Sequence, residues 1–172
     1  MIVLDTSVIS AFAEIGRFPL LKEILNRLSA KAIIPHTVEE EIIFPEAISA
    51  LKTNGGWIGI EKAQDFEKYL FILHDGEAGV IALARKHSWI AALDDLDARK
   101  LAKKEHVKIT GTLGLLKVGY ELCPIKDKLE LQKIINELRT AGFFMATDII
   151  EGILDTKKKL YSPEIISHQI FP

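Results

Sequence analysis

The chain has 172 residues, of which 48% are hydrophobic and 27% are charged, and its formal net charge is −2. These values are typical of one globular domain with a substantial core, and they exclude a disordered chain. The single cysteine, Cys123, excludes both an intramolecular disulfide framework and a zinc site with two thiolates. No apolar run approaches the roughly 20 residues of a membrane-spanning helix. Because the opening residues lack a targeting pattern, we expect a cytoplasmic protein.

The first part of the chain alternates short apolar runs with amphipathic stretches. A run of three apolar residues ends at Asp5, and leucine and isoleucine then recur at helical spacing. The predicted elements are strands over residues 2–4 and 32–35 and helices over residues 6–14 and 20–28.

A longer helix is predicted after the second strand. Thr37 as N-cap, with Glu40 three residues later, forms a capping box, and the helix is expected to continue to about Leu51. Residues 54–56 read Asn-Gly-Gly and predict a turn, and residues 64–71 predict a short helix.

The rest of the chain continues the alternation. Residues 89–93 are nearly all apolar, which is typical of a buried parallel strand, and Gly142 is expected to end a helix. Because strands and helices alternate over short connections, we expect an α/β fold: a three-layer, Rossmann-like α/β/α sandwich around a parallel sheet. The further predicted elements are strands over 89–93 and 107–109 and helices over 75–86, 95–104, 112–119, 127–140 and 146–158.

Acidic residues follow two of the predicted strands. Asp5 follows the first strand, and Asp94 and Asp95 follow the strand at 89–93. In parallel sheets, binding sites form at the carboxyl ends of the strands, so these acids should share one edge. Glu77 projects from the apolar stripe of its helix, where a carboxylate needs a partner or a metal ion.

Glu41 completes the set of acids, since it lies near the apolar face of its predicted helix. Four carboxylates at one edge would repel one another strongly without a cation. Hard oxygen ligands without cysteine or histidine suit Mg²⁺ or Mn²⁺. Such ions activate a water molecule and stabilise the leaving oxygen of an in-line displacement at a phosphate.

Several segments together resemble the PIN-domain nucleases, a family that includes toxins of bacterial and archaeal toxin–antitoxin pairs. The resemblance runs from Met1 to about Leu154, and its strength lies in the order and spacing of the segments. Two of them carry Gly-Glu-Ala and Gly-Thr-Leu-Gly-Leu-Leu, which are similar to the signatures of one PIN subfamily. The segments are residues 2–7, 34–42, 75–84, 93–102, 110–116 and 137–143.

The resemblance implies a PIN domain over residues 1–156 that acts as a metal-dependent ribonuclease, with a tail of unknown role at 157–172. Its catalytic acids would hold Mg²⁺ or Mn²⁺ directly or through water, and its hydroxyl residues would orient a metal-bound water. Many PIN proteins carry Asp where this chain has Glu77. The implied catalytic residues are Asp5, Glu41, Glu77 and Asp95; the metal ligands are Asp5, Glu77 and Asp95; secondary candidates are Thr6, Ser7, Asp97 and, in the alternative registers, Glu40 and Asp94.

A basic helix follows the last acidic segment. Lysine and arginine side chains bind the phosphates of nucleic acids, so we expect RNA contacts there. The expected contact residues are Arg99, Lys100, Lys103 and Lys104. The resemblance also implies a homodimer and, if the protein is a toxin, an antitoxin that blocks the site.

Receiver domains and some phosphatases also place acids at the ends of strands. A receiver domain would need a lysine after the strand at 107–109, where Thr110-Gly111 stands, and a phosphatase would need a second aspartate soon after Asp5. A PIN-like domain that binds RNA or a protein partner without cleaving is the main alternative. One sequence is compatible with both a housekeeping nuclease and a toxin.

Overall fold

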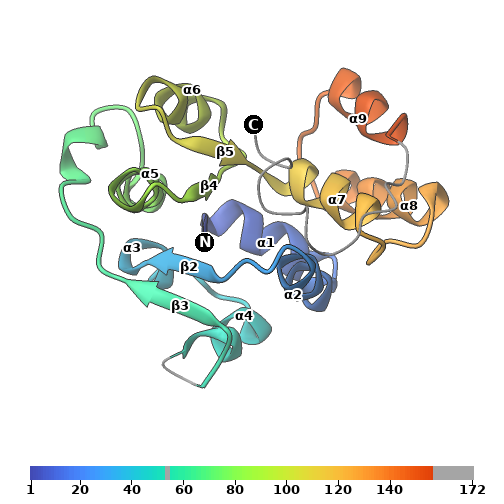
Figure 1. Ribbon diagram of the computed structural model, residues 1–172, viewed down its shortest axis with the longest axis horizontal. Coiled ribbons are helices and arrows are strands. Elements are labelled where there is room, and N and C mark those ends of the chain that lie inside the picture. Colours follow the sequence, from blue (N-terminus) through green and yellow to red (C-terminus); the bar gives the residue numbers. More distant parts are fainter. Residues whose placement is uncertain (53–54, 157–172) are drawn as a thin grey trace.

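The computed structural model describes residues 1–52 and 55–156 (Figure 1). Five parallel strands form one sheet in the order β3-β2-β1-β4-β5. This confirms the α/β class and the parallel sheet. The strands are β1 (Ile2–Leu4), β2 (Ala32–Pro35), β3 (Ile58–Glu61), β4 (Ile90–Ala92) and β5 (Lys108–Thr110).

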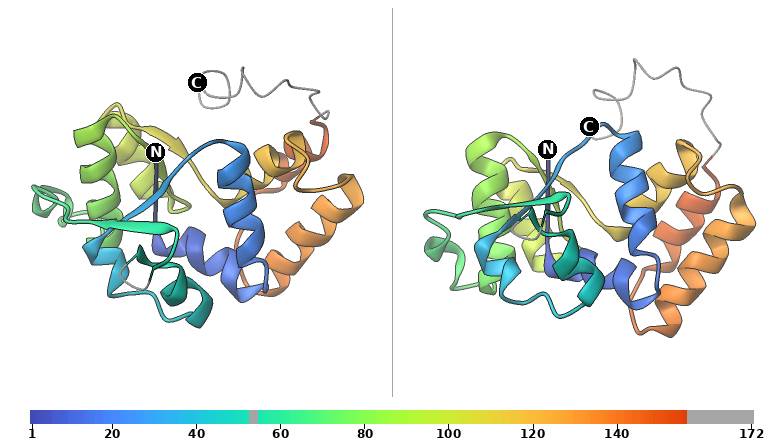
Figure 2. Two further views of the ribbon diagram at one scale, coloured as in Figure 1. Left: turned by 60° about the horizontal axis from the view of Figure 1, so that its bottom comes forward. Right: turned by 90° about the horizontal axis from the view of Figure 1, so that it is seen from below.

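Helices cover both faces of the sheet, which gives the expected three layers (Figures 1 and 2). On one face, α5 contacts the three central strands and packs against α3 and α6. On the other face, α1 packs against α2 and α4, and α2 packs against α7. The helices are α1 (Thr6–Glu14), α2 (Phe18–Arg27), α3 (His36–Glu39), α4 (Pro45–Ala50), α5 (Asp75–His87), α6 (Leu96–Lys104) and α7 (Thr112–Glu121).

Two further helices, α8 (Lys128–Thr140) and α9 (Thr147–Leu154), lie at the far end of the molecule and pack against α7 (Figure 1). Gly142 has a φ of +93° just after α8, so it ends that helix as expected. Arg17, which caps α2, ties this end to the body through Glu137 of α8. Its Nε and Nη2 atoms donate to the two carboxylate oxygens at 2.6 and 3.1 Å.

The prediction of one helix from Thr37 to about Leu51 is wrong. The chain forms the short α3, leaves the helical conformation, and begins α4 at Pro45. Phe44 is extended because a residue that precedes proline is sterically kept out of the helical region. The capping box does not form, because Pro35 is the N-cap of α3 and the buried Thr37 Oγ1 has no hydrogen-bond partner.

The sequence analysis also did not predict β3, and it predicted two helices that are longer than those in the structure. The strand is four residues long, contains Gly59, and lies at the edge of the sheet beside β2, so its apolar pattern is weak. The helix expected over 64–71 is a single 3₁₀ turn at Glu67–Tyr69. The helix expected over 146–158 is α9, which ends at Leu154; residues 157 and 158 lie outside the described part, as does the tail 157–172.

The core explains why the strands are so apolar. Val3 and Leu4 of β1 and Ala91 and Ala92 of β4 have no exposed surface, since helices cover both faces of the sheet. Within the described ranges, no helix has the length and apolar character needed to cross a membrane.

Candidate active site

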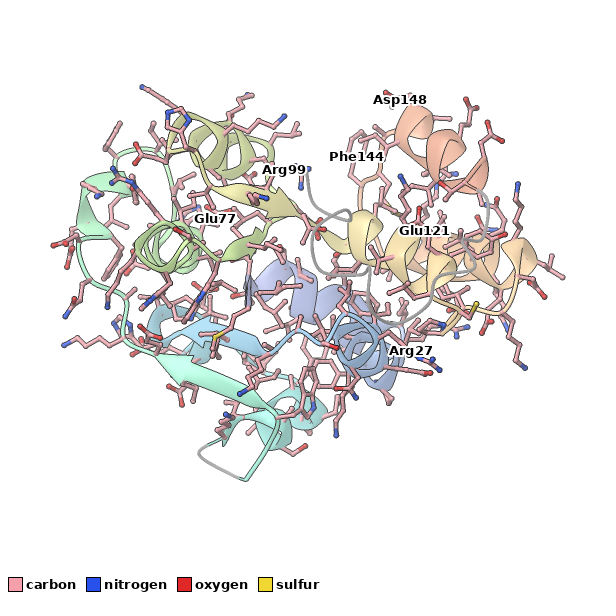
Figure 3. All side chains as sticks on the ribbon, viewed as in Figure 1. Arg27, Glu77, Arg99, Glu121, Phe144 and Asp148 are labelled. Carbon is pink, nitrogen blue, oxygen red and sulfur yellow. The ribbon has the colours of Figure 1, made fainter. Side chains whose placement is uncertain are left out.

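The sheet brings the ends of β1, β2 and β4 to one edge, and the predicted acids stand there. Asp5 directly follows β1, Asp94 and Asp95 follow β4, and Glu41 lies just after α3, the helix that follows β2. Glu77 joins them from the first turn of α5, the helix that packs across the three central strands. Figure 3 labels Glu77 on α5, in the left part of the view.

Asp5 is the most buried of these acids, with 5% of its surface exposed. It is also the N-cap of α1: its Oδ2 accepts hydrogen bonds from the Ser7 backbone N–H at 3.1 Å and from Ser7 Oγ at 2.6 Å. Burial raises the pKa of the Asp5 carboxyl, the bonds from Ser7 oppose this, and the charge of Glu41 adds to the rise. Ser7 therefore orients Asp5.

Glu41 reaches the same edge although its helix has already ended. Thr6 Oγ1 donates a short hydrogen bond to Glu41 Oε2. A Cβ atom on Gly76 would lie 3.0 Å from each carboxylate oxygen of Glu41. The carboxylate of Glu41 thus lies between the start of α1 and the start of α5. Gly76, which it approaches, directly precedes Glu77. Glu40 and Glu41 are both exposed, and of the two it is Glu41 that accepts the Thr6 hydroxyl and whose charge acts on Asp5.

Glu77 is half-buried and faces other acids. Its Oε2 accepts the backbone N–H of His74, the N-cap of α5, at 3.2 Å. Burial is the largest cause that raises the pKa of the Glu77 carboxyl, and the charges of Asp5 and Asp95 raise it further. The two shifts link Asp5 with Glu41, and Glu77 with both Asp5 and Asp95.

Asp95 and Asp94 point in different directions. Asp95 is the N-cap of α6, and its Oδ1 accepts the backbone N–H groups of Asp97 and Ala98 at 2.8 Å each. Asp94 turns to α7, where it accepts Thr112 N–H at 2.8 Å and Thr112 Oγ1 at 2.5 Å. Of the two, Asp95 is the acid whose charge acts on Glu77.

The expected RNA-contact residues have unequal surroundings. Arg99 Nη1 donates to the backbone carbonyls of Leu93 and Thr110, both at 2.7 Å, so it ties together the ends of β4 and β5. Lys100 pairs with the exposed Asp97 at 2.7 Å, as neighbours on α6 do at this spacing. Lys103 and Lys104 are exposed in the last turn of α6.

Sequence reasoning did not identify three residues that shape this edge. Gly76 leaves room for the Glu41 carboxylate, and Gly111 leaves room for Asp94, since a Cβ there would lie 2.5 Å from Asp94 Oδ1. Thr112 binds Asp94 with both its amide and its hydroxyl group. The glycines and threonines at 110–114, part of the segment that resembles a PIN subfamily, were the available signal.

The acids suit a divalent cation in type and charge. Within the described ranges, no three acidic, histidine or cysteine side chains lie close enough to enclose a metal ion by themselves. Mg²⁺ often binds through one or two carboxylates and keeps several waters, so an enclosed cage is not required. Besides burial, the charge of Glu41 raises the pKa of Asp5, and the charges of Asp5 and Asp95 raise the pKa of Glu77, so negative charge gathers here that a cation would neutralise. We conclude that the donor set fits Mg²⁺ or Mn²⁺.

Comparison with protein families gives an independent result. Residues 1–159 match the model of a family described as a PIN domain. Searches of curated proteins and of solved structures found no match. The family match covers most of the chain, and the parallel sheet flanked by helices agrees with it. The chain therefore belongs to the PIN-domain family, whose members are generally nucleases.

Proposed function

We propose that this PIN-domain protein is an endoribonuclease that uses Mg²⁺ or Mn²⁺ to hydrolyse phosphodiester bonds of RNA. The observation that carries the proposal is the acidic edge itself. Four carboxylates from four segments of the chain converge where β1, β2 and β4 end, and burial and mutual repulsion raise the pKa values of two of them. A protein that needed these acids only as helix caps would have no reason to bring them together.

Each side chain has a role in the proposed reaction that follows from its surroundings. Asp5, Glu41, Glu77 and Asp95 would hold the metal ion, each either directly or through a bound water. The ion would supply a water of lowered pKa and would offset the charge that develops on the phosphate. Ser7 keeps Asp5 in one orientation, and Thr6 does the same for Glu41. The exposed Lys103 and Lys104 add positive charge for the RNA backbone.

The test is cleavage of a labelled single-stranded RNA in the presence of Mn²⁺, with EDTA in a parallel reaction. Asp5→Asn is the key variant, because asparagine keeps the shape and caps a helix as well as aspartate does. Asp127→Asn is the matched control: Asp127 also caps a helix, with its Oδ1 accepting the Glu130 amide at 2.8 Å, but it belongs to α8.

The proposal predicts cleavage by the wild type and by Asp127→Asn, and loss of at least about a hundredfold for Asp5→Asn and in EDTA, which is the scale for a group that acts on the reacting atoms. Cleavage that survives EDTA and Asp5→Asn would trace to a contaminant and refute the proposal. Failure to cleave, together with no Mn²⁺ binding, would support a PIN domain that binds RNA or a partner without cutting.

A further inference from the structure

An apolar groove of about 840 Å³ lies between the end of β5 and α9. Its walls come from α6, the start and middle of α7, the connection from α8 to α9, and α9 itself. Figure 3 labels Arg99 and Phe144 near its two sides and Glu121 on α7. The apolar side chains that line it include Leu96, Ile109, Leu113, Val118, Phe144 and Ile149.

Several of the apolar side chains that line the groove are largely exposed to solvent. Phe144 is 92% exposed, Leu96 is 68% exposed and Ile149 is 51% exposed. Exposed apolar side chains that gather in one groove mark an interaction site, since isolated ones are common and these are not isolated. Within residues 1–52 and 55–156, no segment covers these side chains.

The groove also holds a buried charge. Glu121 of α7 lines it and has only 4% of its surface exposed. Among the described residues, no hydrogen bond or ion pair engages its carboxylate. Its oxygens are not sealed from solvent, so a cationic side chain that enters the groove can pair with them. The missing occupant should therefore combine apolar side chains with a basic group.

The chain's own C-terminal segment, residues 157–172, has this composition. Three consecutive lysines begin it, directly after the last described residue, Thr156. Six large apolar side chains follow the lysines: Leu160, Tyr161, Ile165, Ile166, Ile170 and Phe171.

The segment also starts in the right place. Gly152 and Ile153, in the last turn of α9, line the same groove as Glu121. Lys157 follows Ile153 by four residues, a reach of about 14 Å, and the whole segment extends to about 55 Å. Because the segment is tethered to the groove wall, its effective concentration at the groove is in the millimolar range. A free partner lacks this advantage.

We propose that residues 157–172 dock in this groove in cis, with the lysines at 157–159 meeting Glu121 and the apolar side chains covering Phe144 and Ile149. RNA is a poorer occupant, because the charged side chains lining the groove are balanced: Asp94 and Glu121 against Arg99 and Lys117. The inference goes beyond RNA cleavage and does not depend on it.

The test is site-directed photo-crosslinking in the full chain. A benzophenone is attached through Phe144→Cys in a Cys123→Ser background, since Cys123 is exposed. Leu129→Cys is the matched control, because Leu129 is 80% exposed on α8 and lies outside the groove lining. Crosslinked peptides are identified by mass spectrometry over a range of protein concentrations.

The proposal predicts crosslinks from position 144 to residues 157–172 at monomer mass, with a yield that does not change with concentration, and at least fivefold less of them from position 129. Glu121→Gln, which keeps the side-chain shape, should lower the yield at position 144 at least threefold. Dimer-mass crosslinks would show that a second copy fills the groove. Those crosslinks, equal yields at both positions, or no effect of Glu121→Gln would each overturn the proposal.

Discussion

Two ends of the same sheet edge use acidic residues in opposite ways. At the end of β1, Asp5 and Glu77 face other carboxylates, and burial together with that repulsion raises their pKa values. At the ends of β4 and β5, Asp94 faces the amide and hydroxyl of Thr112, and Arg99 binds two strand-end carbonyls. Both ends place an aspartate directly after a strand. The neighbours of a carboxylate, and not its position in the fold, therefore separate a candidate metal ligand from a structural cap.

The largest effect on stability is expected when Arg99 is replaced. We predict that Arg99→Met lowers the free energy of unfolding by about 2–3 kcal/mol, because two charged hydrogen bonds are lost and the carbonyls of Leu93 and Thr110 lose a donor. Urea unfolding measures the change. Lys100→Met, one residue along α6, should cost less than about 0.5 kcal/mol, since its pair with Asp97 is exposed.

Equal stability of the two variants, with weaker RNA binding for Arg99→Met, would contradict this structural role. It would place Arg99 in the RNA-binding surface instead.

The next largest effect is expected at Gly111. A Cβ there would lie 2.5 Å from Asp94 Oδ1 and 2.9 Å from the Leu93 carbonyl oxygen. Gly111→Ala should therefore lower the free energy of unfolding by about 2 kcal/mol, as overpacking usually does. The control is Gly152→Ala in α9, where a Cβ would meet nothing within 4 Å. That variant should be neutral or more stable, because alanine favours a helix over glycine, and a loss of stability equal to that of Gly111→Ala would argue against the steric cause.

A smaller effect of a different kind is expected at Gly76. A Cβ there would lie 3.0 Å from both Glu41 oxygens, and the end of a side chain can move aside at little cost. Gly76→Ala should therefore keep its stability but cleave RNA about tenfold more slowly, because a displaced catalytic group loses rate steeply. Normal cleavage by a folded Gly76→Ala variant would remove Glu41 from the proposed site.

The smallest effect is a change in thermal stability with pH. Because the pKa of Glu77 is raised on folding, its charged form destabilises the folded state, and this penalty is present above the raised pKa. It vanishes as the pH falls below the unfolded value of 4.5. Glu77→Gln, which can still accept the His74 amide, should therefore melt a few degrees higher than the wild type at pH 7.5 in EDTA.

The same difference should shrink towards pH 4, and saturating Mg²⁺ at pH 7.5 should also reduce it by stabilising the wild type. A difference that does not depend on pH would show that the substitution acts through packing and not through charge.

Much of the fold could be predicted from the sequence because its strands are buried on both faces. The apolar runs that end at Asp5 and Asp94 leave little alternative to parallel strands with acids at their ends. The pattern was weaker for β3, an edge strand that contains Gly59. The helix expected from Thr37 failed at Phe44, because the restriction imposed by Pro45 outweighed an apolar pattern of helical spacing.

The site was predictable as a set of acids but not as a set of contacts. Glu77 stood out because a carboxylate interrupted an apolar stripe, and the structure places it within reach of Asp5 and Asp95. Arg99 could not be interpreted in the same way. Its role depends on the separation of the β4 and β5 ends, which no local pattern encodes. Glu121 gave no signal, because its burial depends on tertiary packing and not on a local pattern.

The central claim is that the carboxylates at the β1 end bind a divalent cation whereas Asp94 serves the fold. Calorimetric titration with Mn²⁺ of the wild type, Asp5→Asn and Asp94→Asn tests it most directly. We predict that the wild type and Asp94→Asn bind Mn²⁺ with similar affinity, and that Asp5→Asn binds Mn²⁺ at least tenfold more weakly. Equal weakening by both substitutions, or no binding by the wild type, would contradict it.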